Sequence, residues 1–556
     1  MQWYIDDREC CVRIRDKFNM TKGIERESAA ERGPKADGRT QKECQMEKRI
    51  VLAGIILCSW FLGAYAQGTT GTISGTVKDQ QGAAVAGASV RIVNDETGES
   101  RFIPADSAGR YWVSLSPGNY RISIEQQGFE GVEVSVTLPA ARDIVVNFER
   151  REASSGGSRA IVSSLEPLSA TIAPRTVREL PLSSRSYDAL IPLVPGVIPY
   201  TPGVGFSSFE FGAGPRFSAA GGRGYTNSFL LDGTDINDHA NGTPGGAGVQ
   251  SNPGIEAVRE LTAATGPGNA EYGRTSGAVV SAITRSGSNQ FHGSAYGYHS
   301  NSALNEPNFF DFGSGPPYRR HQFGGALGGP IHKDRTFFFV NYEGSRQGVN
   351  FSSRSIVPDI QSRQGLLPDR SAFVPVPNLK QGMLPYANAL WPVPNGPEVL
   401  LGNGLPSGTA FFYNSPVLAS NGDFGVARVD HQIGEKTRLL VRYAVDDDSR
   451  VLPQPNPIFN DVTSARRQYS TIQLSQDLRP SLSNSFRFAY NRTAQYLDSL
   501  PSVSLPPNLS FVSGQPVGSI TIGLFGGVMS AGSNSNAPRR WPYNLFQWGD
   551  DLSYVR

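Results

Sequence analysis

The residues that could do chemistry are spread too thinly along this chain to form a catalytic or metal-binding motif. Its six histidines include no H-E-x-x-H motif and no other close ligand pair, and the chain has neither a G-x-S-x-G elbow nor a P-loop. All four cysteines stand at or before position 58, so the remainder can form neither a disulfide nor a cysteine metal site. We therefore expect no catalytic residues, no metal site and no cofactor.

Two acidic clusters have simpler explanations than ion binding. Asp232-Gly-Thr-Asp-Ile-Asn-Asp238 does not have the spacing of an EF-hand loop, and its Asp-Gly pair favours a tight turn. Asp446-Asp-Asp448 follows an apparent strand, and we interpret it as a solvated loop. Positive and negative charges nearly cancel, with 51 Lys plus Arg against 49 Asp plus Glu. Nothing in this balance indicates a nucleic-acid partner.

Residues 46–66 have the three parts of a secretory signal peptide. Met46-Glu-Lys-Arg49 is basic, Ile50 to Leu62 is mostly apolar, and Ala64-Tyr-Ala66 before Gln67 fits a cleavage site. The apolar run is shorter than the roughly 20 residues that a spanning helix needs. We expect an exported protein cleaved after Ala66; a membrane anchor and a buried helix are the alternatives.

The two ends of the chain lead to two further expectations. Residues 1–45 carry mixed charge without an apolar period, so we interpret them as a start-site artefact or a disordered extension. The chain stops at Asp551-Leu-Ser-Tyr-Val-Arg556, apparently inside a strand. We interpret this as a C-terminal truncation of the record or of the gene.

Residues 67–150 show the short alternating segments of a small β-sandwich. Apolar alternation recurs between turns such as Glu96-Thr-Gly98 and Pro117-Gly-Asn119. The phrases Gly71-Thr-Ile-Ser-Gly-Thr-Val77 and Pro117-Gly-Asn-Tyr-Arg-Ile122 resemble the carboxypeptidase regulatory-like domain. That resemblance implies a transthyretin-like or Ig-like sandwich that serves as a structural or docking module, with glycan binding as the alternative.

Residues 151–173 form a polar linker, and residues 174–285 carry a series of specific phrases. These include Arg216-Phe-Ser218, Asn227-Ser-Phe-Leu-Leu-Asp-Gly-Thr-Asp-Ile-Asn237 and Gly277-Ala-Val-Val-Ser-Ala-Ile-Thr-Arg-Ser-Gly287. In this order they resemble the plug of TonB-dependent outer-membrane receptors of the Oar-like branch. The resemblance implies an α+β plug. A short extended segment of the linker is the best candidate for TonB contact, with a plain linker as the alternative: Arg159, Ala160, Ile161, Val162 and Ser163.

Residues 286–556 alternate between apolar and polar positions over long stretches. Leu439, Val441 and Tyr443 alternate with Arg438 and Arg442, and aromatic residues crowd Thr336-Phe-Phe-Phe-Val-Asn-Tyr342. Charged residues such as Arg428, Asp430 and Arg442 suit a polar lumen. This region resembles the Oar-like barrel, and we expect a partial antiparallel transmembrane β-barrel. At roughly 20 residues per strand with its connection, it holds about a dozen strands.

The resemblance implies a mainly β outer-membrane receptor that is not an enzyme. It implies transport of an unidentified small-molecule, glycan or peptide substrate, driven by the TonB complex of the inner membrane, with outer-membrane lipid around the barrel. An adhesin or glycan-binding surface protein without transport is the alternative. Tyr386 and Trp391 lie in the Pro-rich segment 352–415, which we interpret as a long surface loop, and they either contact substrate or anchor that loop.

Overall fold

The computed structural model describes residues 70–554 with gaps, of which the longest are 126–131, 150–158, 201–215, 238–253, 266–274 and 305–316. The predicted start region and signal peptide, with Ala64, Ala66 and Gln67 at its cleavage site, lie outside the described residues. Among the residues described, no helix is both long enough and apolar enough to cross a membrane.

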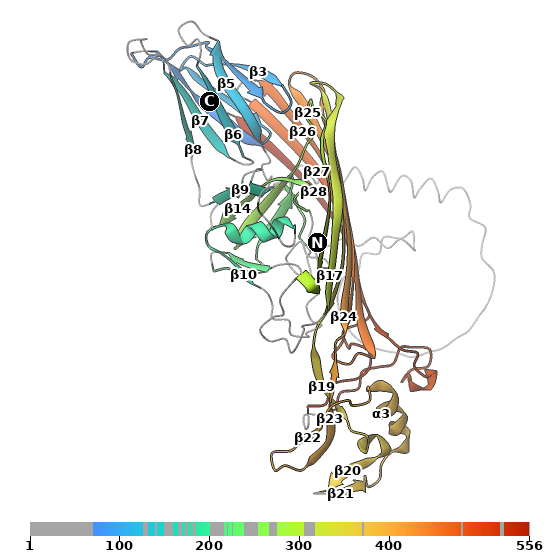
Figure 1. The fold of residues 1–556 in the computed structure, drawn as a ribbon. Coiled ribbons are helices and arrows are strands. Elements are labelled where there is room, and N and C mark those ends of the chain that lie inside the picture. Colours follow the sequence, from blue (N-terminus) through green and yellow to red (C-terminus); the bar gives the residue numbers. More distant parts are fainter. Residues whose placement is uncertain are drawn as a thin grey trace, which may run out of the picture. The chain divides into compact units, whose positions relative to one another are not determined.

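The first described unit is a two-sheet sandwich, as the sequence predicted (Figure 1). One sheet has the order β4-β1-β7-β8 and the other β3-β2-β5-β6. Strands β1 and β7 run parallel, whereas the other neighbours are antiparallel. The strands are β1 (Gly71–Lys78), β2 (Ser89–Asn94), β3 (Ser100–Pro104), β4 (Arg110–Leu115), β5 (Gly118–Glu125), β6 (Glu133–Leu138), β7 (Asp143–Glu149) and β8 (Arg159–Ser164).

The sandwich has a hydrophobic core of its own. Period-2 alternation puts Ile73, Ile92 and Phe148 between the sheets, where they are fully buried. The Tyr111 hydroxyl donates a hydrogen bond of 2.6 Å to the carbonyl oxygen of Val146, which satisfies its polar atom inside that core. The last strand, β8, lies within the segment that we predicted as a linker.

The middle unit is a five-stranded mixed sheet of order β13-β12-β15-β14-β9 with a small β10-β11 hairpin. Its hydrophobic core continues onto the barrel strands described next, through residues such as Phe339 and Tyr469. The elements are β9 (Ser169–Ile172), the 3-10 helix η2 (Tyr187–Leu193), β10 (Val197–Tyr200), β11 (Arg216–Ala219), β12 (Ser228–Leu231), β13 (Thr234–Asp235), β14 (Val258–Thr265) and β15 (Ala278–Thr284).

The largest element is an antiparallel sheet of eight long strands in the order β16-β17-β18-β24-β25-β26-β27-β28 (Figure 1). Residues 433–436 form a short connection between β24 and β25. The strands are β16 (His292–Asn301), β17 (Tyr318–His332), β18 (Thr336–Asn350), β24 (Val417–Gln432), β25 (Thr437–Pro453), β26 (Phe459–Arg479), β27 (Leu482–Pro501) and β28 (Arg539–Tyr554).

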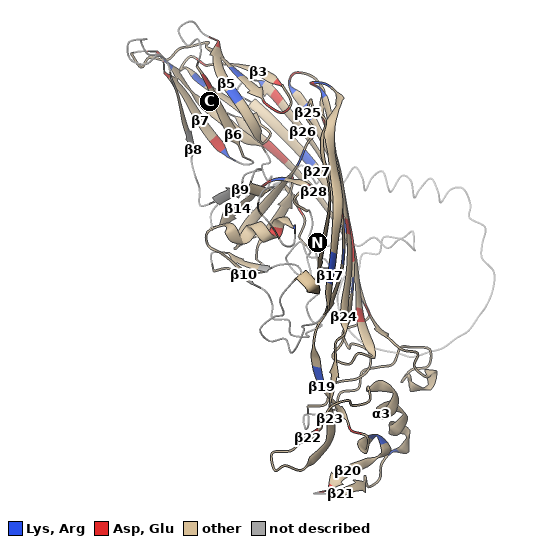
Figure 2. Cartoon of the chain, viewed as in Figure 1, with Lys and Arg blue, Asp and Glu red and all other residues tan. Residues whose placement is uncertain are grey.

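This sheet buries polar side chains and exposes apolar ones, the reverse of a soluble sheet. Along β25, Val441 and Tyr443 are 39 % and 42 % exposed, whereas Arg442 between them is 1 % exposed. On β27, Phe486 and Phe488 are exposed while Arg487 is buried. Lipid would cover such an outer face, and a polar interior is the mark of a membrane barrel. Figure 2 shows acidic and basic residues within the long strands as well as at their ends.

Two expectations about this region were wrong. The segment 352–415 is not a plain loop: it folds into short elements around a small core, with Val357 and Leu390 buried. Because this segment and residues 502–538 use so many residues, the large sheet has eight strands in the part of the chain that the structure describes, and not about a dozen. The short elements are β19 (Ser353–Pro358), β20 (Leu366–Asp369), β21 (Ala372–Pro375), α3 (Leu384–Leu390), β22 (Glu398–Leu400) and β23 (Pro406–Asn414), with 3-10 turns at Ser362–Gln364, Gln381–Met383 and Pro507–Leu509.

Candidate functional site

The candidate site is built on a tight turn of the middle sheet. Strands β12 and β13 pair Leu231 with Thr234, so Asp232 and Gly233 alone make the turn between them. Both turn residues have positive φ, 47° and 72°, as a two-residue type I′ hairpin requires, and Asp-Gly is a preferred sequence for it. The turn predicted from this motif is confirmed, and it aims the Asp232 side chain away from its own hairpin.

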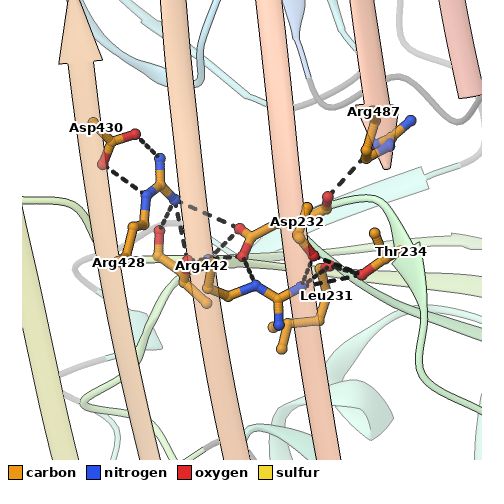
Figure 3. A network of polar contacts seen from close by, with 9 residues as sticks. Leu231, Asp232, Thr234, Arg428, Asp430, Arg442 and Arg487 are labelled. Atoms are coloured by element: carbon orange, nitrogen blue, oxygen red, sulfur yellow. Dashed lines mark hydrogen bonds and ion pairs between the residues drawn. The ribbon is translucent and has the colours of Figure 1, made fainter. Parts of the chain in front are cut away.

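The Asp232 carboxylate is buried and fully engaged. Its Oδ1 accepts a 2.9 Å hydrogen bond from the backbone N–H of Thr284, at the end of β15, and its Oδ2 accepts one of 2.8 Å from the Thr284 hydroxyl. The Nε of Arg442, on barrel strand β25, lies 3.0 Å from Oδ2 in an ion pair (Figure 3). The middle sheet therefore fixes the carboxylate, and the barrel wall supplies its counter-charge.

Arg442 makes further contacts with the same turn. Its Nη2 donates to the carbonyl oxygen of Leu231 at 3.2 Å and to the Thr234 hydroxyl at 3.1 Å, and it also contacts the Thr471 hydroxyl on β26. One guanidinium thus contacts the carboxylate, a carbonyl and a hydroxyl of the hairpin. A planar guanidinium with several donors can make this set of buried contacts, whereas the compact ammonium of a lysine lacks that fixed fork of donors.

A second arginine holds the neighbouring strand end. Arg428, on β24, forms a bidentate pair with Asp430, with two N···O distances of 2.8 Å. Its Nη1 donates to the carbonyl oxygen of Thr284 at 2.9 Å and lies 3.6 Å from Oδ1 of Asp232. Because Asp430 already balances its charge, Arg428 is less dependent on Asp232 than Arg442 is (Figure 3).

Side chains of two further barrel strands form hydrogen bonds with the residues that follow the turn. The Asn491 amide, on β27, donates to the carbonyl oxygen of Asp235. The Gln547 side chain, on β28, both donates to that carbonyl at 3.0 Å and accepts from the Asp235 N–H at 2.9 Å. Tyr543 donates its hydroxyl to the Asn237 carbonyl at 3.0 Å. Residues 231–237 are therefore hydrogen-bonded to four adjacent strands of the wall, β25 to β28. Strand β24 adds the ion pair of Arg428 with Asp232 and its hydrogen bond to Thr284.

A separate charged contact joins the middle unit to the first barrel strands. Arg185 pairs with Glu256 at 3.0 Å, and its guanidinium carbon lies 4.4 Å and 4.7 Å from the ring centres of Tyr296 and Tyr298 on β16. Gly254 lies so close to Glu343 that an added Cβ would stand 1.7 Å from its Oε1. A side chain at position 254 would therefore require the Glu343 carboxylate to move.

The inner wall carries a third charged group that the sequence did not reveal. Arg467, on β26, pairs with Asp446 and lies 3.3 Å from Asp448, both on β25, and all three side chains are buried. Asp447 points to the opposite, exposed face, where it faces Arg466. The predicted solvated loop at 446–448 is therefore wrong: these residues lie inside a strand. The spacing of 446 and 448 was the available signal, because strand residues two apart share a face.

The candidate TonB-contact segment lies in β8 at the edge of the sandwich sheet. Residues 159–164 pair antiparallel with β7, from Glu149↔Arg159 to Ile144↔Ser164. Ala160 packs against the sandwich core, and Val162 is 46 % exposed. The extended conformation is as the sequence suggested, but the segment is part of a sheet and lies far along the chain from the residues of the Asp232 turn.

The two candidate substrate aromatics lie in the core of the segment between β18 and β24. Trp391 is 4 % exposed, and its indole N–H donates to the Met529 carbonyl at 2.8 Å. Tyr386, on α3, is half-buried and lies 5.7 Å from the ring of Phe511. This packing suits the anchoring role left open by the sequence, and substrate contact stays a prediction for both residues.

The contacts between the Asp232 turn and the barrel wall are all noncovalent. Among the described residues, no group of three or more His, Cys, Asp or Glu could hold a metal ion. The Asp232 turn is instead a polar junction between a small sheet and a barrel wall, made of ion pairs and hydrogen bonds that can break and re-form without any chemical step.

Comparison with known proteins agrees with this architecture. Residues 283–556 match the outer membrane beta barrel domain, and residues 72–150 match the carboxypeptidase regulatory-like domain. The TonB-dependent transporter Oar of Myxococcus xanthus is 29 % identical over 324 residues, which cover 53 % of this chain and 28 % of Oar. The chain thus spans little more than a quarter of the length of that relative.

Two solved structures give weaker similarity. The siderophore receptor PirA from Acinetobacter baumannii has a TM-score of 0.40 at 14 % identity, covering 68 % of this chain and 44 % of PirA. The outer membrane transporter YddB from Escherichia coli has a TM-score of 0.38 at 13 % identity, covering 59 % of this chain and 39 % of YddB. At these scores the structural likeness carries no conclusion.

The domain matches and the similarity to Oar confirm the expected mainly β fold, with a small sandwich and a barrel sheet, and the outer-membrane location. The assignment of residues 174–285 as a plug stays a prediction. Oar is named as a transporter, and the expectation that this chain is not an enzyme agrees with that name. The chain therefore contains one region that matches the carboxypeptidase regulatory-like domain and a later region that matches the outer membrane beta barrel domain, and over 324 residues it is similar to the TonB-dependent transporter Oar.

Proposed function

We propose that this chain acts as a TonB-dependent outer-membrane receptor that binds a substrate and transports it across the outer membrane. In this proposal residues 174–285 are the plug, residues 286–556 belong to the barrel around it, and the inner-membrane TonB complex supplies the energy. The relationship to Oar supports the general role. The substrate is a small molecule, glycan or peptide.

The Asp232 turn carries the proposal. It joins the middle unit to the wall through Arg442 and Arg428, and through hydrogen bonds of Asn491, Gln547 and Tyr543. A hydrogen bond contributes about 0.5–1.5 kcal/mol net because water replaces it when it opens. Water that enters the junction can solvate each of these groups in turn. A polar junction of this kind suits a plug that stays in the barrel at rest and moves when force is applied to it.

Substrate can bias such a junction only by binding its two states with different affinity. In the proposal, substrate on the outer side favours the state in which the periplasmic coupling segment is accessible, and pulling on that segment then opens the polar contacts. No covalent chemistry and no cofactor is needed. The work of opening comes from the partner complex.

Deletion of residues 174–285 tests the proposal against the adhesin alternative. The receptor proposal predicts that cells producing the deletion variant lose energy-dependent uptake and admit large antibiotics that intact outer membranes exclude. An adhesin would keep its surface binding and show neither change. The Arg466→Ala variant serves as a control for barrel assembly, because it removes only an exposed ion pair with Asp447. Unchanged uptake and unchanged permeability in the deletion variant would contradict the proposal.

A further inference from the structure

A row of polar side chains crosses four barrel strands on their inward face. The strand register places Gln347 of β18 opposite Ser420 of β24, and Ser420 opposite Arg450 of β25. Thr463 of β26 lies opposite Arg450 on its other side. No register shift separates Arg450 from the inward-facing Arg442, and an even number of residues lies from one to the other, so both share that face.

Three members of this row are shielded from water and lack partners. Ser420 is 1 % exposed. In the part of the chain that the structure describes, the Ser420 Oγ, the Gln347 Oε1 and the Arg450 Nε are buried without a hydrogen-bond partner. Buried polar groups are nearly always paired, so three unpaired groups on neighbouring strands need a common explanation. A polar ligand bound between them supplies one.

Arg450 also differs from other inward-facing arginines of the wall in its charge balance. Four of these lie within 3.8 Å of a carboxylate oxygen: Arg428, Arg442, Arg467 and Arg487. Arg450 forms no ion pair with any residue that the structure describes. Asp448, the closest acidic residue along its strand, pairs with Arg467 at 3.3 Å. Because burial disfavours an unpaired charge, the half-buried guanidinium of Arg450 attracts an anion.

The row lies toward one end of the large sheet. Arg450 is three residues before the end of β25 at Pro453, and Ser420 is three residues after the start of β24 at Val417. The other ends of these two strands are joined by the short connection 433–436, whereas the long segment 351–416 precedes β24. Outer-membrane barrels have short periplasmic turns and longer extracellular loops. The row therefore belongs to the outer half of the barrel, where an entering substrate arrives first.

We propose that Arg450, Ser420 and Gln347 bind a carboxylate group of the transported substrate. This inference rests on the proposed function and narrows its substrate class to molecules that carry a carboxylate. Arg450 supplies the charge, the Ser420 hydroxyl donates a hydrogen bond, and the Gln347 side chain donates one from its NH2 group after a half-turn of the amide.

The charge of the row favours a carboxylate over a phosphate. A phosphate group carries about 1.5 to 2 negative charges at neutral pH, whereas a carboxylate carries a single one. Arg450 supplies one uncompensated positive charge. Arg320, opposite Gln347 on β17, is engaged in an interaction of its own. A monoanion therefore matches the row better than a dianion.

Arginine labelling of the wild-type protein tests the proposal without altering the fold. Phenylglyoxal modifies accessible guanidinium groups, and mass spectrometry of the full-length protein purified from outer membranes gives the rate at each arginine. Acetate is the probe, acetamide is its uncharged counterpart, and inorganic phosphate is the alternative anion, all at constant ionic strength. Arg466, exposed on the outward face of the neighbouring strand β26, is the matched control.

We expect acetate to slow the labelling of Arg450 severalfold and to leave that of Arg466 unchanged, whereas acetamide protects neither. Ser420→Ala should raise the acetate concentration for half-protection about tenfold, because a hydrogen bond to a charged group is lost. Ser449→Ala, on the outward face beside Arg450, should leave that concentration unchanged. Equal protection by acetate and acetamide, equal protection of the two arginines, or stronger protection by phosphate than by acetate would each overturn the inference.

Failure of the proposed function has a different signature. Energy-dependent uptake that survives deletion of residues 174–285 overturns the proposed function and, with it, the role of this row in transport. Absent protection of Arg450, with uptake still lost in the deletion variant, overturns the carboxylate site alone.

Discussion

Asp232 and Arg442 form a buried ion pair, with 3.0 Å between Oδ2 and Nε, across the contact between the middle sheet and the barrel wall. Neither side chain is more than 3 % exposed. Removing one partner of a buried pair costs about 3–5 kcal/mol, because the other charge is left uncompensated. This pair is therefore the most sensitive single point of the junction.

Asp232→Ala is expected to loosen the middle unit by about 3 kcal/mol. Without the carboxylate, Arg442 stays buried without a counter-charge, and Thr284 loses two hydrogen bonds. Limited proteolysis of the full-length protein in outer membranes should cut the middle unit at lower protease concentration. Arg466→Ala, which removes only an exposed pair with Asp447, should change the protease sensitivity by less than the equivalent of about 1 kcal/mol. Equal sensitivity of the two variants would contradict the assigned role of Asp232.

The neighbouring arginines 466 and 467 should differ sharply in their effect on folding. Arg467→Ala leaves the buried carboxylates of Asp446 and Asp448 unpaired, and we expect about 3–5 kcal/mol of destabilisation and a large loss of assembled protein. Arg466→Ala removes only an exposed pair with Asp447, worth about 0–1 kcal/mol. The measurement is the amount of protease-resistant protein in the outer membrane. Similar losses in both variants would argue against an inward-facing Arg467.

A charged residue introduced on the outward apolar face of β25 should destabilise the protein most where that face is most apolar. Tyr443→Arg, in line with exposed Val441, is expected to cost about 2–4 kcal/mol if that face meets the bilayer interior. Ser449→Arg, six residues further along the same face, should cost about 0–1 kcal/mol because it lies nearer the end of the strand. Urea-induced unfolding in lipid vesicles measures both. An equal cost at the two positions would place the membrane boundary elsewhere.

Trp391 should act through the stability of its segment and not through substrate contact. Trp391→Ala removes a buried ring and the bond to the Met529 carbonyl, and a loss of about 3–5 kcal/mol from that segment is expected. Faster hydrogen exchange across residues 353–414 is the predicted readout. Tyr386→Phe keeps the ring contact with Phe511 and should leave exchange unchanged. Unchanged exchange in Trp391→Ala would return this residue to the list of candidate substrate contacts.

The segment between β18 and β24 should be more stable in acid than at neutral pH. Burial, together with the neighbouring carboxylate of Asp359, raises the pKa of Glu398 above its ordinary value. A carboxyl group with a raised folded-state pKa stabilises the fold fully below its unfolded pKa, and this contribution is lost as pH rises through the folded pKa. Proteolysis within residues 353–414 should therefore increase with pH across that window. Glu398→Gln should abolish the dependence, and a dependence that persists would assign it to another group.

The fold was largely predictable from local pattern, whereas the pairing within the site was not. Alternation along Val441, Arg442 and Tyr443 predicted a strand with one polar face, and Asp232-Gly233 predicted its turn. Both are local rules of backbone geometry. That Asp232 meets Arg442 depends on how two separate units pack together, which no spacing within the sequence encodes.

The errors have the same origin. Asp446-Asp-Asp448 resembles a loop by composition, and only the partner Arg467 on the next strand explains why two carboxylates can be buried in β25. The segment 352–415 resembles a loop because it is rich in proline, yet apolar residues within it meet Phe459 and Leu509 from distant parts of the chain to make a core. In both segments, contacts with residues distant in the sequence determine the structure.

A disulfide between the middle unit and the wall tests directly whether this junction must open for transport. The hydroxyl oxygens of Thr234 and Thr471 lie 3.4 Å apart, and the chain has no cysteine beyond position 58 to interfere. We expect that T234C/T471C forms a cross-link in the outer membrane, that energy-dependent uptake stops while the cross-link is intact, and that reduction restores uptake. Uptake that continues at the wild-type rate with the cross-link fully formed would contradict the claim that this junction must open.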